Sequence, residues 1–249
     1  MAKIYGCKSK YLVSNDNKLW IIGTLIVPII SIIIWYYTSK FILNISVSKI
    51  NIYVIFAFFI LIFFGFKKFF KFADKTQKLS IWISNKFHKG WKGEEEVLNV
   101  LKNLSDNYIV FYDVSLYNKG NIDFVLLGPC GLLAIEVKSH YGNFSYQFND
   151  LLNNGYTCKR NFIKQAKRGA VSLNKYLLEK INKNIFVIPI LVFSNKYSKI
   201  KFGFNQIDGC YVIKKEWLIE LITKLPCVFN QNDINLVELE LSKLYVAHN

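Results

Sequence analysis

Several kinds of functional motif are missing from this sequence of 249 residues. It has no GxGxxG segment, no Walker loop and no GxSxG elbow, which argues against a nucleotide-dependent enzyme and against a serine hydrolase. The five cysteines are scattered without a CxxC pair, and the three histidines are isolated. Zinc sites and disulfide frameworks need clustered ligands, so neither is expected, and the cysteines are predicted to be free thiols.

Arginine is scarce, because only Arg160 and Arg168 stand among the 32 cationic residues. Acidic residues number 17, and the formal net charge is +15. A disordered polycation is nevertheless excluded, since 52% of the residues are hydrophobic and disorder requires low hydrophobicity as well as charge. The lack of arginine also argues against base-specific DNA recognition, in which a bidentate arginine on guanine is the commonest contact.

The positive charge and the apolar residues are concentrated toward the N-terminus. Residues 1–89 hold 13 Lys and two acids, a net charge of +11, whereas residues 90–249 hold 19 Lys or Arg and 15 acids, a net charge of +4. Two stretches, 19 and 17 residues long, carry no charge: Leu19 to Tyr37 and Ile50 to Phe66. Each is about long enough to cross a hydrocarbon core of ~30 Å as a helix.

Neither a signal peptide nor a buried hairpin of a soluble domain fits these apolar stretches as well. A signal peptide has a shorter apolar core and is not followed by a second span, and soluble helices are rarely apolar on all sides. We therefore expect transmembrane helices at 19–38 and 50–66, with a basic cytoplasmic N-terminus at 1–18 and a basic juxtamembrane linker at 67–89. The linker is either an ordinary positive flank or a basic segment lying on anionic lipid.

The distribution of lysine around the two stretches predicts their orientation. Four lysines precede the first stretch and five follow the second within 12 residues, while the short loop between them holds only Lys40 and Lys49. Because positive flanks stay in the cytoplasm, both termini are expected there. The predicted location is the cell (inner, or cytoplasmic) membrane, with the chain crossing it twice.

The remaining residues have the pattern of an α/β domain. Val97, Leu98, Leu101 and Leu104 recur at helical spacing after Gly93. Strands are expected at 108–114, 122–127, 132–138, 143–148, 185–194 and 211–213, and further helices at 162–179, 215–223 and 233–245. We expect a domain at 90–195, with 196–249 as a C-terminal extension of the same domain.

The strand predicted at 132–138 carries the first chemical signal. Glu136 and Lys138 alternate with apolar residues and therefore share one face of the strand. A hairpin through Gly128-Pro129-Cys130-Gly131 would bring Asp123 near Glu136. Two buried carboxylates repel, and Mg²⁺ relieves that repulsion by accepting their oxygens as ligands. Alternatively, the strand lies at a sheet edge and its polar face is solvated.

The order of several motifs resembles a known family. The series consists of Gly90-Trp91-Lys92-Gly93-Glu94, Asn121-Ile122-Asp123-Phe124-Val125-Leu126-Leu127-Gly128-Pro129, Gly131-Leu132-Leu133-Ala134-Ile135-Glu136-Val137-Lys138 and then Gly142. Over residues 88–195 it resembles the NERD (nuclease-related) domain, which is itself similar to the PD-(D/E)XK nuclease superfamily. The resemblance implies a restriction-endonuclease-like αβββαβ core with a mixed central sheet.

The resemblance also implies roles for individual residues. Asp123 and Glu136, supported by Glu94, would bind a Mg²⁺ or Mn²⁺ ion, and Lys138 would be the catalytic lysine. Gln165, on the helix after the fourth strand, would support the active face. Taken without the resemblance, Glu94 is accounted for equally well by its place at a helix N-terminus, where acids are favoured, and Gln165 by a place on a helix surface.

A basic cluster near Gln165 can be interpreted in two ways. Its members are Lys159, Arg160, Lys164, Lys167 and Arg168. They either follow a nucleic-acid phosphate backbone or form an ordinary solvated helix face. In line with the first interpretation, the expected function is that of a membrane-anchored, metal-dependent nuclease acting on nucleic acid, with DNA the expected substrate. The alternative is a non-catalytic module that binds nucleic acid or a partner protein at the membrane.

Overall fold

A computed structural model describes residues 1–6, 33, 36, 37, 40, 52–116 and 120–246. The chain divides into two compact units, one formed by Met1–Lys8 with Lys89–Asn249 and the other by Ser9–His88. The first unit contains the predicted α/β domain. Its four described cysteines carry free thiols, as expected.

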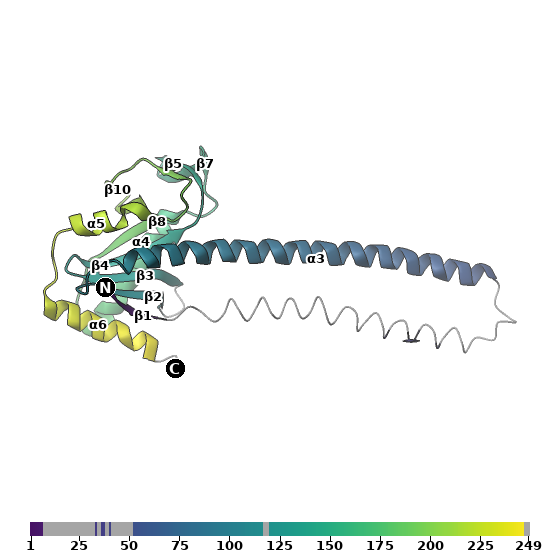
Figure 1. Ribbon diagram of the computed structural model, residues 1–249, viewed down its shortest axis with the longest axis horizontal. Coiled ribbons are helices and arrows are strands. Elements are labelled where there is room, and N and C mark those ends of the chain that lie inside the picture. The colour runs from purple at the N-terminus through teal and green to yellow at the C-terminus, as the bar shows by residue number, and fades with distance from the viewer. Residues whose placement is uncertain (7–32, 34–35, 38–39, 41–51, 117–119, 247–249) are drawn as a thin grey trace. The chain divides into compact units, whose positions relative to one another are not determined.

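The helix expected after Gly93 is the last part of a much longer one. Helix α3 runs without interruption from Ile52 to Leu101 (Figure 1). No proline occurs in this range, so every residue can take part in the helical hydrogen-bond ladder. The segment predicted as a basic linker is therefore helical, and Lys78 and Asp74 form an ion pair across one turn of it at 2.7 Å.

The prediction of two transmembrane helices is not confirmed. Across the part of the chain that the structure describes, no helix combines the length and the apolar character needed to cross a membrane. The first predicted span, at 19–38, lies almost entirely outside the described residues.

A seven-stranded mixed sheet forms the centre of the domain, in the order β1-β2-β3-β4-β8-β11-β10. The strands are β1 (Lys3–Tyr5), β2 (Ile109–Ser115), β3 (Asn121–Gly128), β4 (Gly131–Lys138), β8 (Val187–Phe193), β10 (Gln206–Ile207) and β11 (Cys210–Lys214). Strands β2, β3 and β4 are antiparallel neighbours, whereas β4, β8 and β11 run parallel. The parallel pair β4 and β8 is joined through helix α4 (Phe162–Ile181), as a parallel connection requires.

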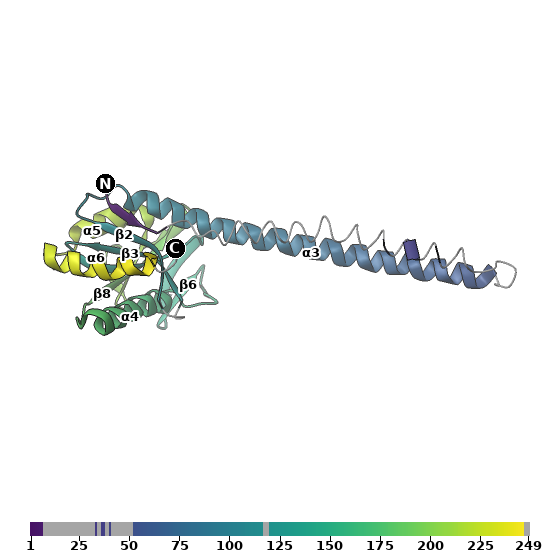
Figure 2. The ribbon, with the colours of Figure 1, turned by 90° about the horizontal axis from the view of Figure 1, so that it is seen from below.

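Helices cover both faces of this sheet. One apolar core lies between the sheet and the last turns of α3 together with α5 (Leu218–Lys224), which follows the short 3₁₀ helix η3 (Lys215–Trp217). A second core lies between the opposite face and helices α4 and α6 (Gln231–Val246). Figure 2 shows α4 and α5 on opposite sides of the sheet. Because both faces are covered, the central strands are apolar throughout, and a charged residue there needs a partner.

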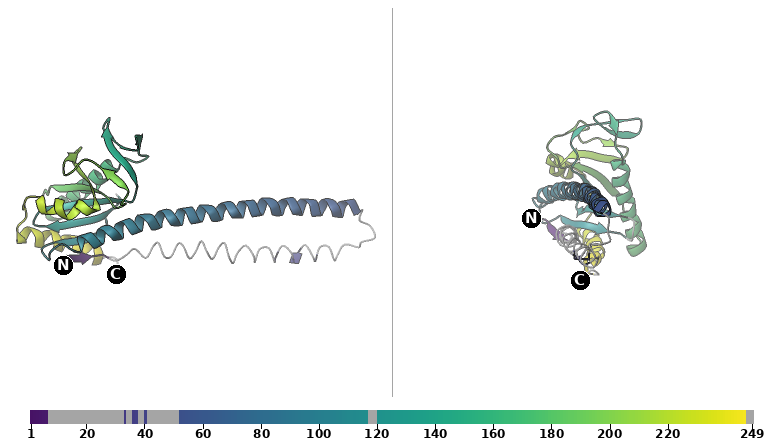
Figure 3. Two further views of the ribbon diagram at one scale, coloured as in Figure 1. Left: turned by 45° about the horizontal axis from the view of Figure 1, so that its top comes forward. Right: turned by 90° about the vertical axis from the view of Figure 1, so that its right-hand side faces the viewer.

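A smaller sheet stands beside the carboxyl end of β4. Its order is β7-β6-β5-β9, formed by β5 (Gly142–Gln147), β6 (Asp150–Asn153), β7 (Tyr156–Thr157) and β9 (Ser198–Ile200). Phe144 and Leu151 pack against Phe162 and Phe193 in a third apolar core. Figure 1 places β5 and β7 together at one end of the domain, and the left view of Figure 3 shows these strands projecting from it.

Most elements predicted for residues 90–249 are confirmed, and the end of α3 with β2, β3, β4, α4 and β8 forms the expected αβββαβ core. Strand β1 was not expected, because residues 1–18 were taken for a basic tail. In the structure Lys3–Tyr5 pairs in parallel with Ile109–Phe111. The Tyr5 ring stacks on Phe111 with 5.0 Å between centroids, and Lys3 bonds Glu238 on α6. Three residues paired with a strand far along the chain leave no periodic signal in the sequence.

Candidate active site

Strand β4 presents Glu136 and Lys138 on the same face, as the alternation predicted. Glu136 is only 6% exposed, and the Lys138 ammonium forms an ion pair with its Oε1 atom. The site is therefore not the solvated edge strand considered as an alternative, because β4 lies between β3 and β8. Lys138 Nζ also lies 5.4 Å from the ring centre of Phe162, the first residue of α4.

The hairpin between β3 and β4 brings Asp123 next to Glu136. Phe124 and Ile135 are the last pair of this antiparallel hairpin toward its open end, and Asp123 and Glu136 are the next residues on the two strands. The backbone N–H of Val137 donates a hydrogen bond to Asp123 Oδ2 at 2.7 Å. The turn has a two-residue loop, and Gly131 supplies the left-handed conformation, with φ at 94°, that restarts the strand.

Helix α3 positions Glu94 through a glycine. At Gly93 a Cβ atom would collide with the Ser194 side chain and crowd Ser139, which follow the ends of β8 and β4. Glycine at this position therefore lets the helix pass close to these strand ends without displacing either serine. One residue later, Glu94 accepts a hydrogen bond of 2.9 Å from the Tyr112 hydroxyl on β2. Glu94 is thus held inside the domain and is not simply an acid at a helix N-terminus, because α3 begins 42 residues earlier.

Helix α4 contributes Gln165 from the other side of the sheet. Asn161 caps the helix by accepting the Lys164 N–H at 2.9 Å, which sets where the first turn begins. Gln165 then donates from Nε2 to Glu136 Oε1 at 2.6 Å. Gln165 is therefore not a free surface residue. The same carboxylate oxygen is held by Lys138 and Gln165, which orients Glu136 from two elements.

Burial changes the acid–base properties of the two facing acids. Burial first, and then the charges of Glu136 and Glu94, raise the pKa of Asp123 well above its ordinary value. The Val137 N–H and Lys138 oppose this shift. Burial also raises the pKa of Glu136, against the lowering effects of Lys138, Gln165 and Arg168. The charge of Glu136 thus disfavours the ionised form of Asp123, as expected of carboxylates that share one site.

Glu94 belongs to the same electrostatic group. Burial raises its pKa, the Tyr112 hydrogen bond opposes that effect, and the charges of Asp113 and Glu136 raise it further. Burial and the neighbouring Glu94 in turn raise the pKa of Tyr112. Three acids in mutual repulsion concentrate unfavourable negative charge at one end of β3 and β4.

The donor set fits a divalent cation in its chemistry. Mg²⁺ and Mn²⁺ take carboxylate oxygens, and Asp123 and Glu136 are a facing pair whose repulsion a cation would relieve. Among the residues that the structure describes, however, no group of three or more His, Cys, Asp and Glu side chains is arranged as a metal site. Glu94 interacts with the other acids through charge and is not gathered with them into a three-ligand cluster.

The predicted basic cluster divides into two parts. Lys159 and Arg160 precede Asn161, the cap of α4, and therefore do not lie on this helix, while the other three members of the cluster do. Lys167 forms an ion pair with Asp208 at 3.0 Å, and the charge of Arg168 acts on Glu136. A hollow of ≈ 710 Å³ runs along α4 and is lined by Asn161, Lys164, Lys167, Arg168, Val171 and Ser172.

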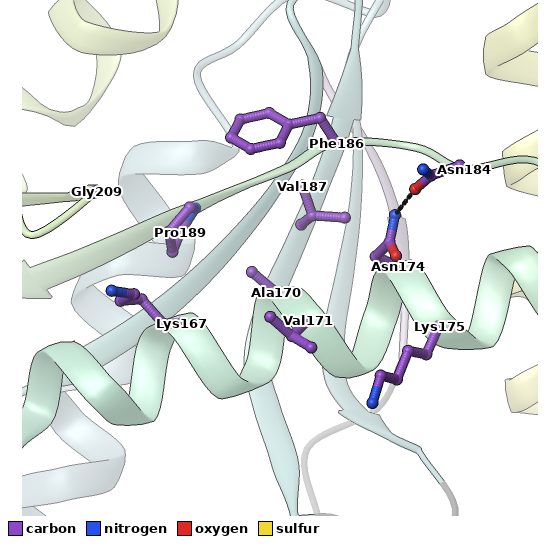
Figure 4. Close-up of a pocket in the computed structure, with 10 residues that line it drawn as sticks. All are labelled: Lys167, Ala170, Val171, Asn174, Lys175, Asn184, Phe186, Val187, Pro189 and Gly209. Atoms are coloured by element: carbon purple, nitrogen blue, oxygen red, sulfur yellow. Dashed lines mark hydrogen bonds between the residues drawn. The ribbon is translucent and has the colours of Figure 1, made fainter.

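A second hollow lies further along the same helix. It measures ≈ 460 Å³ and is lined by Lys167, Ala170, Val171, Asn174, Lys175, Asn184, Phe186, Val187, Pro189 and Gly209 (Figure 4). Asn174 on α4 donates a hydrogen bond to Asn184 at 2.9 Å across one end of it. This hollow is not lined by the acid site, a name used here for Glu94, Asp123, Glu136 and Lys138.

Two residues of the site were missed at the level of sequence. Tyr112 holds Glu94, and Phe162 lies beside the Lys138 ammonium. Tyr112 stands in an apolar strand and has no distinguishing spacing, so nothing in the sequence marks it. Phe162 was expected only as the first residue of the helix at 162–179, although its position at the start of α4 places it beside Lys138 at the end of β4.

Comparison with curated proteins and with solved structures gives no significant match to this chain. The αβββαβ order with a mixed sheet fits a nuclease-like fold, and the acids, the lysine and the glutamine converge at one end of it. Residues 89–194 match the model of the NERD family, described as the nuclease-related domain, and this part of the chain is therefore a nuclease-related domain.

Proposed function

We propose that this domain hydrolyses phosphodiester bonds of nucleic acid with the help of a divalent cation, and that DNA is the substrate. The observation that carries the proposal is the facing pair of Asp123 and Glu136, with Lys138 bonded to Glu136. A nuclease-related domain over the same residues makes nucleic acid the substrate to test.

Each residue has a role that follows from its contacts. Asp123 and Glu136 would hold the ion, Mg²⁺ or Mn²⁺, through their carboxylate oxygens. When bound, such an ion supplies Lewis-acid stabilisation of the phosphate oxygens. The Lys138 side chain stands next to Glu136, where as an ammonium it would position the attacking water and as the neutral amine it would accept the proton of that water. Gln165 orients Glu136 by its hydrogen bond of 2.6 Å, and Glu94 adds negative charge to the site.

The decisive experiment incubates the full-length chain with plasmid DNA and either Mg²⁺ or Mn²⁺. Cleavage that stops on addition of EDTA, returns with excess metal and is lost in Asp123→Ala and Lys138→Ala supports the proposal. Asp106→Ala, which changes an exposed acid of the same domain, is the matched control and should cut normally. If the folded wild type binds DNA in a salt-sensitive manner without cutting it, the non-catalytic binding module is the correct description.

We further propose that residues 19–38 and 50–66 attach this domain to the cell membrane. The support comes from their uncharged sequences and from strand β1. Strand β1 precedes the two stretches and strand β2 follows them, and both strands belong to one sheet. A chain that crosses a bilayer between these strands must therefore cross it an even number of times. Extraction of membranes at alkaline pH tests this, because a membrane-spanning protein stays in the pellet and a peripheral protein is released.

A further inference from the structure

Four large aromatic side chains around the smaller sheet are exposed. Tyr141, Phe148, Tyr156 and Tyr197 have exposed fractions of 68, 96, 80 and 66%. Aromatic side chains of this size normally bury 150–250 Å² each. The nearby rings of Phe144 and Phe193 do so, with centroids 4.1 Å apart. The exposed rings therefore contribute little to the folding of this sheet.

Tyr141 and Tyr197 stand side by side next to the acid site. Strands β5 and β9 are parallel, with Gly142 opposite Ser198, so the residues just before them are neighbours. The Ser198 hydroxyl donates to the His140 carbonyl at 2.7 Å, which ties the two strand starts together. Tyr141 is three residues beyond Lys138, at most about 11 Å along the chain.

Phe148 occupies the tip of the β5–β6 hairpin in an unfavourable conformation. The two loop residues, Phe148 and Asn149, have φ angles of 54° and 57°. This left-handed turn suits Asn and Gly, whereas a bulky residue adopts it rarely. An exposed Phe thus takes the place of a residue that would form the same turn at lower cost. Along β5 the tip lies about 23 Å from Tyr141.

Cations are interleaved with these rings. Five exposed basic residues belong to the same loops and strands: Lys159, Arg160, Lys196, Lys199 and Lys201. Lys196 Nζ lies 4.9 Å from the ring centre of Tyr197. Two acids lie in these segments, and both have partners: Asp150 accepts from Asn161, and Asp208 pairs with Lys167. The surface therefore combines net positive charge with exposed rings, which is the composition that binds unpaired nucleotides.

We propose that the smaller sheet binds single-stranded nucleic acid, with Tyr141 and Tyr197 stacking on bases beside the acid site and Phe148 stacking on a base near the hairpin tip. This inference rests on the proposed function and specifies its substrate as unpaired strands. Stacking is tolerant of sequence because every base has a π face. Binding that does not depend on base sequence is consistent with the scarcity of arginine, because arginine most often reads base edges and this chain has only two.

The test measures binding of fluorescent oligonucleotides to the full-length chain in EDTA, so that cleavage does not interfere. The ligands are dT12, dT3 and a 12-base-pair duplex. The variants are Tyr141→Ala with Tyr197→Ala, and Phe148→Asn, which suits the turn. Phe186→Ala, at a ring that is 78% exposed beside the hollow of Figure 4, is the control.

The double tyrosine variant should weaken dT12 and dT3 binding by at least about 5-fold per ring, since each stacked base contributes about 1–3 kcal/mol. Phe148→Asn should weaken dT12 but leave dT3 unchanged, because a trinucleotide is too short to reach the tip. Duplex binding and the control should change less than about 2-fold, because phosphate contacts dominate binding to a duplex.

Equal losses for the duplex, or losses in the control as large as those in the variants, overturn the inference while leaving nucleic-acid binding intact. If the wild type binds none of the three ligands, the proposed function itself fails. Vesicles containing anionic lipid provide the last comparison. Binding of vesicles that depends on these rings, together with unchanged dT12 affinity, would assign the rings to a lipid surface and overturn the inference.

Discussion

Replacing Asp123 by Asn is expected to stabilise the domain near neutral pH and to abolish its cleavage of DNA. Asn keeps the shape of Asp and can still accept the hydrogen bond from the Val137 N–H, which is 2.7 Å long in the wild type. It removes one of the two facing negative charges. The substitution therefore separates the cost of the acid pair in folding from its value in catalysis.

The magnitude follows from the register of the hairpin. Residues directly opposite in antiparallel strands have Cβ atoms about 5 Å apart. Two charges at that distance repel by about 3 kcal/mol at an effective dielectric constant of about 20. Conversion of a charged hydrogen bond into a neutral one costs about 1 kcal/mol, and the lost attraction to Lys138 costs about as much again. A net stabilisation of about 1 kcal/mol remains, or about 2–4 °C in Tm for a domain of this size.

The assay is thermal unfolding of the full-length chain between pH 4 and pH 8 without metal. The raised pKa of Asp123 means that the wild type loses stability as the pH rises from the ordinary value for Asp through the raised one. The Asn variant lacks this loss, so the two Tm values should be close at pH 4 and diverge toward pH 8. Mg²⁺ should raise the Tm of the wild type and have little effect on the variant.

The exposed Asp106→Asn exchange is the control and should leave the Tm unchanged. A variant less stable than the wild type at pH 8, or a difference in Tm that does not depend on pH, would refute the argument from charge repulsion.

Two further variants test how the site is positioned. Gly93→Ala should lower both the Tm and the cleavage rate, since the new methyl group collides with Ser194. Gly90→Ala should be tolerated, or should stabilise the domain by up to about 1 kcal/mol, because the surroundings of Gly90 are open and Ala favours a helix. Gln165→Leu removes a hydrogen bond that lowers the pKa of Glu136, so the acidic limb of the pH–rate profile should move to higher pH.

The outcomes that would contradict these expectations are specific. Equal effects of Gly93→Ala and Gly90→Ala would mean that close packing at Gly93 does not position α3. For Gln165, Glu179→Leu at an exposed position of the same helix is the control for changes in the helix itself. A lower rate with an unmoved pH profile in Gln165→Leu would limit this residue to a structural role.

Local patterns in the sequence determined much of the domain. Alternation in residues 131–138 placed Glu136 and Lys138 on one face, and the Gly-Pro-Cys-Gly turn set the antiparallel register that brings Asp123 near Glu136. Both depend on neighbours along the chain, which is why they can be read without a structure. The same holds for α4, whose cap at Asn161 and apolar face lie within one segment.

Contacts between distant segments were decided only by the tertiary structure. The pairing of β1 with β2 joins residues more than 100 positions apart, and the bond from Tyr112 to Glu94 depends on how closely α3 passes the sheet. The structure also has a second sheet apart from the first, around which Tyr141, Phe148 and Tyr197 are exposed. Both features depend on tertiary packing, because these side chains stay outside the apolar cores. A sequence records which side chains can form a core, whereas packing between distant elements decides which of them stay outside it.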